Sequence, residues 1–330
     1  MKSFKIILVL SLPLFLIPGC KKDTTSTTST TTSTYSSTGT TSGVFCKVVD
    51  NSSNLVTTAL AKSANFTKGL TVFGINILAT SDVSDAKLLH AANITAELKD
   101  NNEDGTADNP TVLKALVDNS TFVKMYNLQS GNSVTIDTDV LDNAGVSKNT
   151  SLGAYETVDN YADGVSHDAS IEEIFHLITQ YGYSVAYPTV FEESNTSTSA
   201  MALAMDTARG GRQLTTTDGA WVYNNTTCPA TGSVDSGKAW WFLDQASADY
   251  KTMQTEYMYW AVTSKFGMHD STAGRTKADS EWCPNTKAEL LAQDPTIYNL
   301  IDNATYAFPT VLPDASYSAC TFTTSDIITF

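Results

Sequence analysis

The chain has 330 residues and a formal net charge of −15, from 20 basic and 35 acidic residues. Binding to a nucleic-acid backbone requires a basic footprint, so this balance excludes nucleic acid as a partner. An apolar content of 42% is typical of a globular body, and an acidic surface is compatible with an exported protein that binds cations.

The first 19 residues have the features of a targeting signal. Lys2 and Lys5 precede an apolar run over 6–18, about 13 residues long and shorter than the roughly 18 that span a bilayer. The run ends in LIPGC, which resembles the bacterial lipobox. This resemblance implies a lipoprotein signal peptide over 1–19 and lipidation of Cys20. Lys21-Lys22-Asp23, after the cysteine, resembles the leader of outer-membrane lipoproteins, which implies anchoring to that membrane, on its periplasmic side or at the cell surface. The alternative is an ordinary signal peptide followed by a chance cysteine.

A tether and one globular domain are predicted to follow. Residues 20–43 are dominated by Ser and Thr and bury little apolar area, so we expect a flexible linker behind the lipidated cysteine. Residues 44–330 are long enough for a single domain, with a sheet-containing half over about 44–160 and a helical half over about 161–330.

The predicted elements, in chain order, define the fold class. Hydrophobic periodicity and cap residues predict strands at 70–79, 121–128, 133–140 and 152–158, and helices at 84–99, 110–117, 171–181, 196–208 and 246–265. We therefore expect an α+β fold in which a small sheet with helices precedes a mainly helical half.

The segment DNNEDGTAD, residues 100–108, resembles an EF-hand or dockerin-type calcium loop. Oxygen ligands alternate around a tight turn at Gly105, as a hard cation requires. The resemblance implies calcium as a structural cofactor, with these ligands: Asp100, Asn102, Asp104, Asp108 and the carbonyl of Thr106. Thr111 stands where an EF-hand has a bidentate Glu, which implies weak binding. A solvated acidic loop is the alternative.

The stretch IEEIFH, residues 171–176, supports two interpretations. In the first, Ser170 and Glu173 form a capping box, and the two acids favour the positive end of the helix dipole. In the second, Glu172 and His176 project together and bind one metal ion. The pattern E-E-x-x-H resembles the zincin metallopeptidase helix H-E-x-x-H, which implies that Glu173 is the general base. The order of a sheet, this helix and then a helical half also resembles zincin architecture.

A third ligand is needed for such a site. Glu256 is the best candidate because it lies on an apolar helix face, and zincins of one group likewise take a carboxylate from a downstream helix. The alternative is a buried Glu bonded to a tyrosine or an arginine. A site with two carboxylates accepts zinc but also suits manganese or iron. Tyr257 and Tyr259 are candidates to assist an oxyanion.

Other histidines are weaker candidates. His90 could supply an imidazole from across the fold, and His167 could do so from a loop, whereas His269 follows the helix of Glu256. Each of them alone is more often a packing or surface residue.

Four cysteines remain after Cys20, an even number in a compartment that permits disulfides. Three pairings are possible. We favour Cys46 with Cys320 and Cys228 with Cys283, and the absence of C-x-x-C spacing argues against a thiolate zinc site.

Two functions are consistent with these features. The first is a calcium-stabilised cell-envelope lipoprotein that is a divergent metal-dependent, peptidase-like hydrolase. The second is a non-catalytic, calcium-stabilised surface lipoprotein that binds a peptide or protein on a degenerate peptidase scaffold. Three segments, LLHAANITAELKDNNEDGTADNP, IEEIFHLIT and TEYMYWAVTS, also resemble a group of exported proteins, but that resemblance implies no chemistry.

Overall fold

The computed structural model divides the chain into two compact units, Met1–Ser42 and Gly43–Phe330. It describes residues 45–47, 59–127, 134–157, 168–212, 239–241, 243, 248–270 and 282–330. The predicted signal peptide, the lipidation at Cys20 and the tether lie outside the described residues, as do His167 and Cys228.

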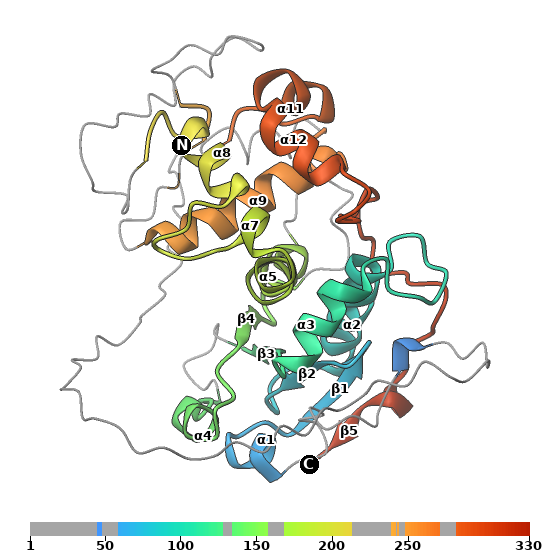
Figure 1. Ribbon diagram of the computed structural model, residues 1–330. Coiled ribbons are helices and arrows are strands. Elements are labelled where there is room, and N and C mark those ends of the chain that lie inside the picture. The colour runs from blue at the N-terminus through green and yellow to red at the C-terminus, as the bar shows by residue number, and fades with distance from the viewer. Residues whose placement is uncertain are drawn as a thin grey trace, which may run out of the picture. The chain divides into compact units, whose positions relative to one another are not determined.

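A five-stranded mixed sheet, in the order β4-β3-β2-β1-β5, lies at one end of the second unit (Figure 1). The strands are β1 (Lys68–Val72), β2 (Ile75–Ala79), β3 (Phe122–Tyr126), β4 (Asn149–Gly153) and β5 (Ile328–Thr329). β1 pairs antiparallel with β2 and with β5, whereas β2, β3 and β4 run parallel. The helices α2 (Asp85–Lys99) and α3 (Pro110–Asp118) connect β2 to β3 and supply the crossover that a parallel pair requires.

The first predicted strand, 70–79, is wrong as a single strand, because it folds into the hairpin of β1 and β2. The chain reverses at Phe73 and Gly74, whose φ angles are 50° and 84°. Two consecutive positive φ values are the requirement of the tight turn that matches the twist of a hairpin, and a glycine meets it without strain.

The other strand predictions have mixed outcomes. The predicted strand at 121–128 is confirmed as β3. The one at 133–140 is wrong: Asp137 caps the helix α4 (Thr138–Asn143), accepting a hydrogen bond from the Val140 amide. The one at 152–158 is shifted, because β4 begins at Asn149 and a turn follows Gly153.

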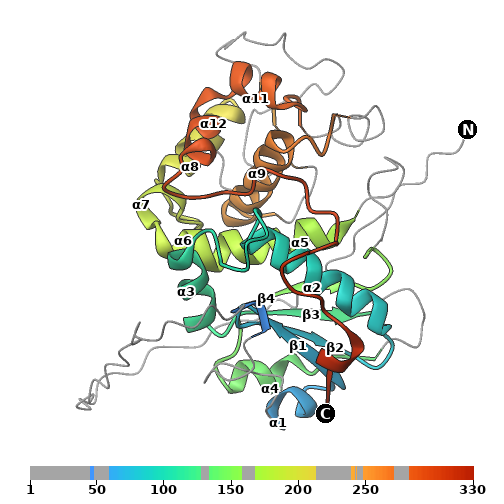
Figure 2. The ribbon, with the colours of Figure 1, turned by 90° about the vertical axis from the view of Figure 1, so that its right-hand side faces the viewer.

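Alternating side chains of the sheet enter two cores. Ile77 and Val123 belong to the large core shared with α2 (Asp85–Lys99), whereas Leu78 and Phe122 face a smaller cluster with residues of α1 (Ala59–Ser63) and α4. This alternation is the two-residue period of a strand whose faces are both covered. Figure 2 shows α2 and α3 (Pro110–Asp118) on one side of the sheet and α1 and α4 on the other.

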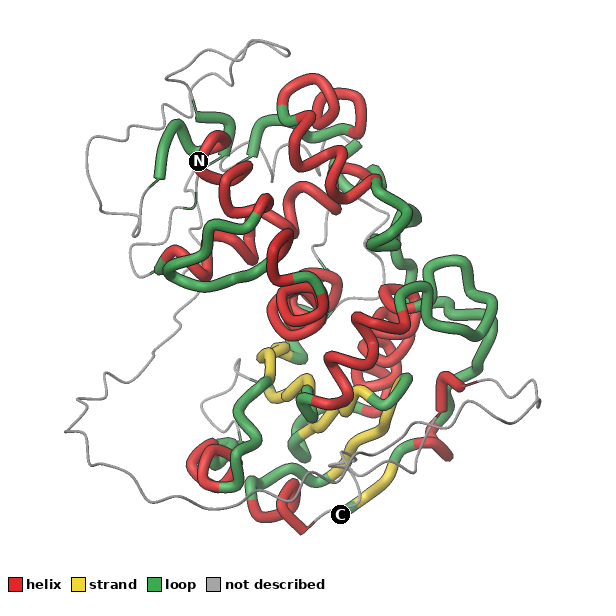
Figure 3. Tube along the Cα trace, viewed as in Figure 1, coloured by secondary structure: helices red, strands yellow, loops and turns green. Residues whose placement is uncertain are grey.

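The second half of the unit contains helices and loops among the described residues (Figure 3). The elements are α5 (Ala169–Ile178), a π-helix η4 (Thr179–Tyr183), α6 (Ser184–Ala186), α7 (Pro188–Phe191), α8 (Ala200–Ala208), α9 (Tyr250–Lys265), α11 (Lys287–Gln293) and α12 (Pro295–Asp302). The short 3-10 turns η1 (Phe45–Lys47) and η5 (Thr324–Asp326) lie near the ends of the unit. The predicted α+β class, with a small sheet followed by a helical half, is therefore confirmed.

The last residues of the chain return to the sheet. β5 pairs with β1, and a disulfide joins Cys46 to Cys320, as predicted. Cys283 is also disulfide-bonded. Because Cys228 lies outside the described residues, the pairing of Cys228 with Cys283 stays a prediction.

Candidate metal centre

The helix α5 begins earlier than the predicted capping box requires. Its N-cap is Asp168, whose carboxylate accepts a hydrogen bond of 2.9 Å from the Ser170 amide. The box of Ser170 and Glu173 is therefore wrong. The short side chain of Asp168 already accepts from the free Ser170 amide at the start of the helix, so Glu173 need not turn back to cap it.

The structure brings together Glu172, His176 and Glu256. One ligand atom from each side chain lies within 4.8 Å of the others, and within the described part of the chain this is the one group of three or more His, Cys, Asp or Glu residues placed in this way. Glu172 and His176 meet because they are four residues apart on α5. Glu256 reaches them from α9, which packs against α5.

His176 is the centre of this group. The residue is only 8% exposed, and its Nε2 atom is buried with no hydrogen-bond partner, 3.5 Å from Oε2 of Glu256. The predicted alternative for Glu256, a tyrosine or arginine partner, is not what the structure shows, because the partner of its carboxylate is His176.

Charge at the site favours a cation. Burial disfavours the imidazolium form, but the carboxylates of Glu256, Glu173 and Glu172 outweigh burial and raise the pKa of His176 to about 10. The same negative charge attracts a metal ion, and a metal that binds the imidazole must displace its proton.

Glu173 lies beside the group but on the other side of the imidazole ring. Its Oε2 atom accepts a hydrogen bond of 2.9 Å from the Thr150 hydroxyl and is 3.9 Å from Nδ1 of His176. Burial raises its pKa to about 8, against the lowering effect of His176. A carboxylate near the second ring nitrogen is typical of a residue that orients a metal-binding histidine.

Aromatic residues surround the group unequally. The ring of Tyr259 packs edge-on against His176, with 5.8 Å between centroids. Tyr257, in contrast, donates a hydrogen bond of 2.6 Å to Asp294 and so is not directed to the group as an oxyanion ligand.

The other predicted histidines take part in separate contacts. Nε2 of His90 lies 2.7 Å from the carboxylate of Asp168 and thereby connects α2 to the start of α5, so the structure does not bring His90 into the group. His269 packs on Trp260, and its Nε2 lies 2.9 Å from the Thr263 hydroxyl.

The predicted calcium loop is a tight turn between α2 and α3. The carboxylate of Asp100 accepts hydrogen bonds from the amides of Gly105, at 2.7 Å, and Asp104, at 3.2 Å, and from the Tyr317 hydroxyl. Asp108 accepts from the Asn101 amide at 2.7 Å. Gly105 has a φ of 88°, the conformation predicted for the turn.

These contacts leave calcium as a prediction. The side chain of Asn102 accepts from the Asp104 amide at 3.0 Å, and the Asp104 carboxylate accepts from the Thr106 amide at 2.9 Å. Polar side chains of the loop therefore bond its own backbone, and the loop carboxylates do not converge as Glu172, His176 and Glu256 do.

One buried acid near the centre had no signal in the sequence. Glu193 lies in the loop between α7 and α8, is 6% exposed, and accepts a hydrogen bond from the Thr255 hydroxyl on α9. Burial raises its pKa to about 7, although hydrogen bonds from Thr255 and Thr179 oppose the shift. Its partner is distant in sequence, and its neighbours are polar loop residues that predict exposure.

No family model, curated protein or solved structure matches the chain. Among the described residues, every helix is too short or too polar to cross a bilayer. The structure thus defines an α+β protein with a candidate metal centre between α5 and α9.

Proposed function

We propose that the protein binds one divalent transition-metal ion through Glu172, His176 and Glu256 and is a divergent, peptidase-like hydrolase. The observation that carries the proposal is the buried Nε2 atom of His176, which has no hydrogen-bond partner and faces Glu256, with a carboxylate oxygen of Glu172 within 4.8 Å. A buried polar atom without a hydrogen bond is costly, and a metal bond would satisfy it.

The residues fit the chemistry of a catalytic centre. Three protein ligands leave a coordination position open, and a metal ion bound there supplies Lewis-acid polarisation and a water of lowered pKa. Glu172 and Glu256 would contribute two negative charges, and Glu173 is the candidate general base. Two oxygen ligands make the site harder than one of three imidazoles, so zinc competes there with manganese and iron.

The zincin-like architecture is part of the same proposal. The metal helix follows a sheet and packs against β4, while the third ligand comes from a later helix, α9. The lipobox adds attachment of Cys20 to the outer membrane, on its periplasmic or surface side, and the loop over 100–108 adds weakly bound structural calcium.

One observation favours the second function, a non-catalytic binding lipoprotein on a degenerate peptidase scaffold. Glu173 is held by Thr150 and lies toward Nδ1 of His176, not on the Nε2 side that faces Glu256. A general base must reach the water in the open position of the metal, and a carboxylate on the far side of the ring would have to move to do so.

Elemental analysis of the purified full-length protein tests the metal site. We expect about one transition-metal ion per chain after dialysis without chelator, and its loss in a His176→Ala variant. His269→Ala is the matched control, because His269 is also buried, 2% exposed, but lies outside the group. Equal metal content in all three proteins would refute the site. A bound metal without hydrolysis of any peptide library would favour the binding protein.

A further inference from the structure

A buried carboxylate connects the two helices that supply the candidate metal ligands. Glu193 accepts a hydrogen bond from the Thr255 hydroxyl, which is next to Glu256 on α9. Thr179, the first residue after α5, also stabilises the Glu193 carboxylate, and its hydroxyl donates a hydrogen bond of 3.2 Å to the backbone carbonyl of His176. A third link joins the same elements, because Gln180 donates a hydrogen bond of 2.9 Å to the Thr255 hydroxyl.

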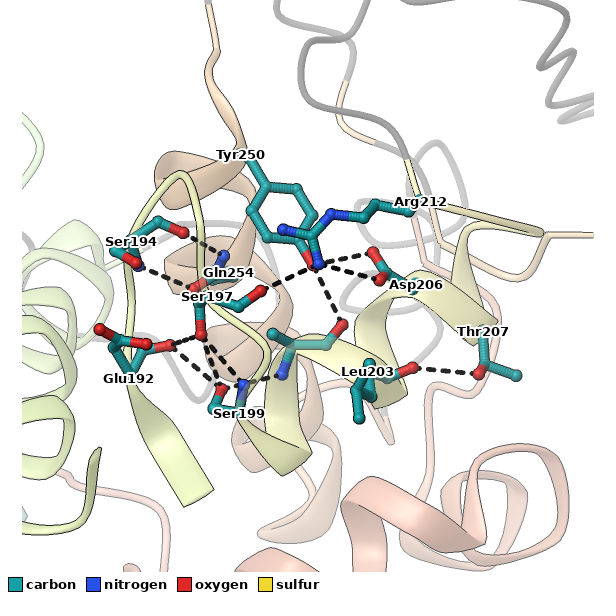
Figure 4. Close-up of polar contacts among 11 residues, drawn as sticks. Glu192, Ser194, Ser197, Ser199, Leu203, Asp206, Thr207, Arg212, Tyr250 and Gln254 are labelled. Atoms are coloured by element: carbon teal, nitrogen blue, oxygen red, sulfur yellow. Dashed lines mark hydrogen bonds and ion pairs between the residues drawn. The ribbon is translucent and has the colours of Figure 1, made fainter. Parts of the chain in front are cut away.

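The loop that carries Glu193 is itself held at both sides. The backbone amide of Glu193 donates a hydrogen bond of 2.9 Å to Ser184 Oγ. Gln254 accepts from the Ser194 amide at 3.1 Å and donates to the Ser194 carbonyl at 3.0 Å, so the loop is fixed to α9 one residue before Thr255. Figure 4 shows the contact between Ser194 and Gln254, together with Ser197 and Ser199, whose hydroxyls donate to the Glu192 carbonyl just ahead of α8.

We propose that Glu193 is a positioning residue for the candidate metal centre: it sets the rotation of α9 relative to α5 so that Glu256 faces Nε2 of His176. The inference rests on the proposed metal site. Mutation of outer-shell groups that hold metal ligands in their binding orientation typically lowers metal affinity by about 10–100-fold. Glu193 would act in this way through Thr255, the neighbour of Glu256, and through Thr179, whose hydroxyl bonds the His176 carbonyl.

Two features of the molecule support a role in positioning over one in packing. A buried carboxylate costs free energy, and an apolar residue would fill the same space without that cost. Thr179 is also the first residue of the π-helix η4, a local irregularity that directly follows α5 and is frequent at functional sites.

The test compares Glu193→Ala and Glu193→Gln with a control at another buried acid that accepts a hydrogen bond from α9. Asp294→Asn is that control, because Asp294 is buried, 3% exposed, and accepts a hydrogen bond from Tyr257 on α9 without contact to the metal group. For each full-length protein, one measures the dissociation constant for Co²⁺, the visible Co²⁺ absorption spectrum and the thermal unfolding midpoint.

We expect Glu193→Ala to weaken Co²⁺ binding by about 10–100-fold and to alter the visible spectrum. Glutamine keeps an acceptor oxygen for Thr255 and should restore most of both. Asp294→Asn should lower the unfolding midpoint but leave the affinity and spectrum unchanged. If Glu193→Ala does not fold, Thr255→Val, which removes the hydroxyl at nearly constant volume, takes its place with the same expectation.

Two results would overturn the inference, and they are distinguishable. If wild type binds Co²⁺ and Glu193→Ala lowers the unfolding midpoint with the affinity and spectrum unchanged, Glu193 is a packing residue and the metal site stands. If folded wild type binds no Co²⁺, the proposed function fails and the positioning role fails with it.

Discussion

Removing the disulfide between Cys46 and Cys320 should strongly destabilise the domain. The two cysteines are 274 residues apart, so the bond closes almost the whole folded unit into a loop. In the chain-entropy model a loop of this length restricts the unfolded state by about 19 cal/mol/K, or about 5–6 kcal/mol at 25 °C. Unfolded chains are more compact than the model assumes, so we expect a measured loss of about 3–5 kcal/mol.

The assay is urea unfolding of wild type and of the Cys46→Ser, Cys320→Ser double variant at one pH. The variant should unfold at lower urea with a steeper dependence on denaturant, because its unfolded state is less compact and exposes more surface. A Cys46→Ser single variant also lacks the bond, so it should lose a similar amount of stability. A double variant within about 1 kcal/mol of wild type would refute the argument that the closed loop stabilises the fold through the unfolded state.

Two further predictions concern buried acids. Burial raises the pKa of Glu97 to about 7, although the amides of Asp314 and Ala315 donate to its carboxylate. The contribution of Glu97 to stability is therefore present below its ordinary pKa and lost as pH rises through about 7. The Glu97→Gln variant should accordingly gain stability relative to wild type between pH 5 and pH 8. Urea midpoints of variant and wild type that differ by the same amount at both pH values would contradict this. At the N-cap of α5, Asp168→Ala should lower the free energy of unfolding in urea by about 1–2 kcal/mol, and Asp168→Asn should lower it less, because asparagine still caps the helix. Equal losses in the two variants would show instead that the contact with His90 is the larger stabilising interaction.

Local signals in the sequence predicted many of the elements. Ser84 caps α2 and gives its start, and Asn109 followed by Pro110 gives the start of α3. Where prediction was wrong, the competing signal was also local. Phe73 takes a positive φ in the hairpin turn, which few residues of its kind adopt, and Asp137 starts a helix in a segment rich in β-forming residues.

The candidate site was predicted only in part. The spacing of Glu172 and His176 places them together on any helix, so the sequence by itself determined that pair. The sequence also determined the α+β class, because strand and helix periodicities and their order along the chain are present before the elements pack. The orientation of Glu173 was not determined in the same way, since Thr150 on β4 draws its carboxylate to the Nδ1 side of the ring.

Only the tertiary structure decided that Glu256 faces His176 and that Glu193 lies buried between α5 and α9. Contacts between distant residues depend on how whole helices pack, and no periodicity or spacing within one segment encodes the rotation of one helix against another. Glu193 is the clearest example. Its sequence neighbours predict a solvated turn, and it becomes a buried hydrogen-bond acceptor only because folding places Thr255 and Thr179 beside it.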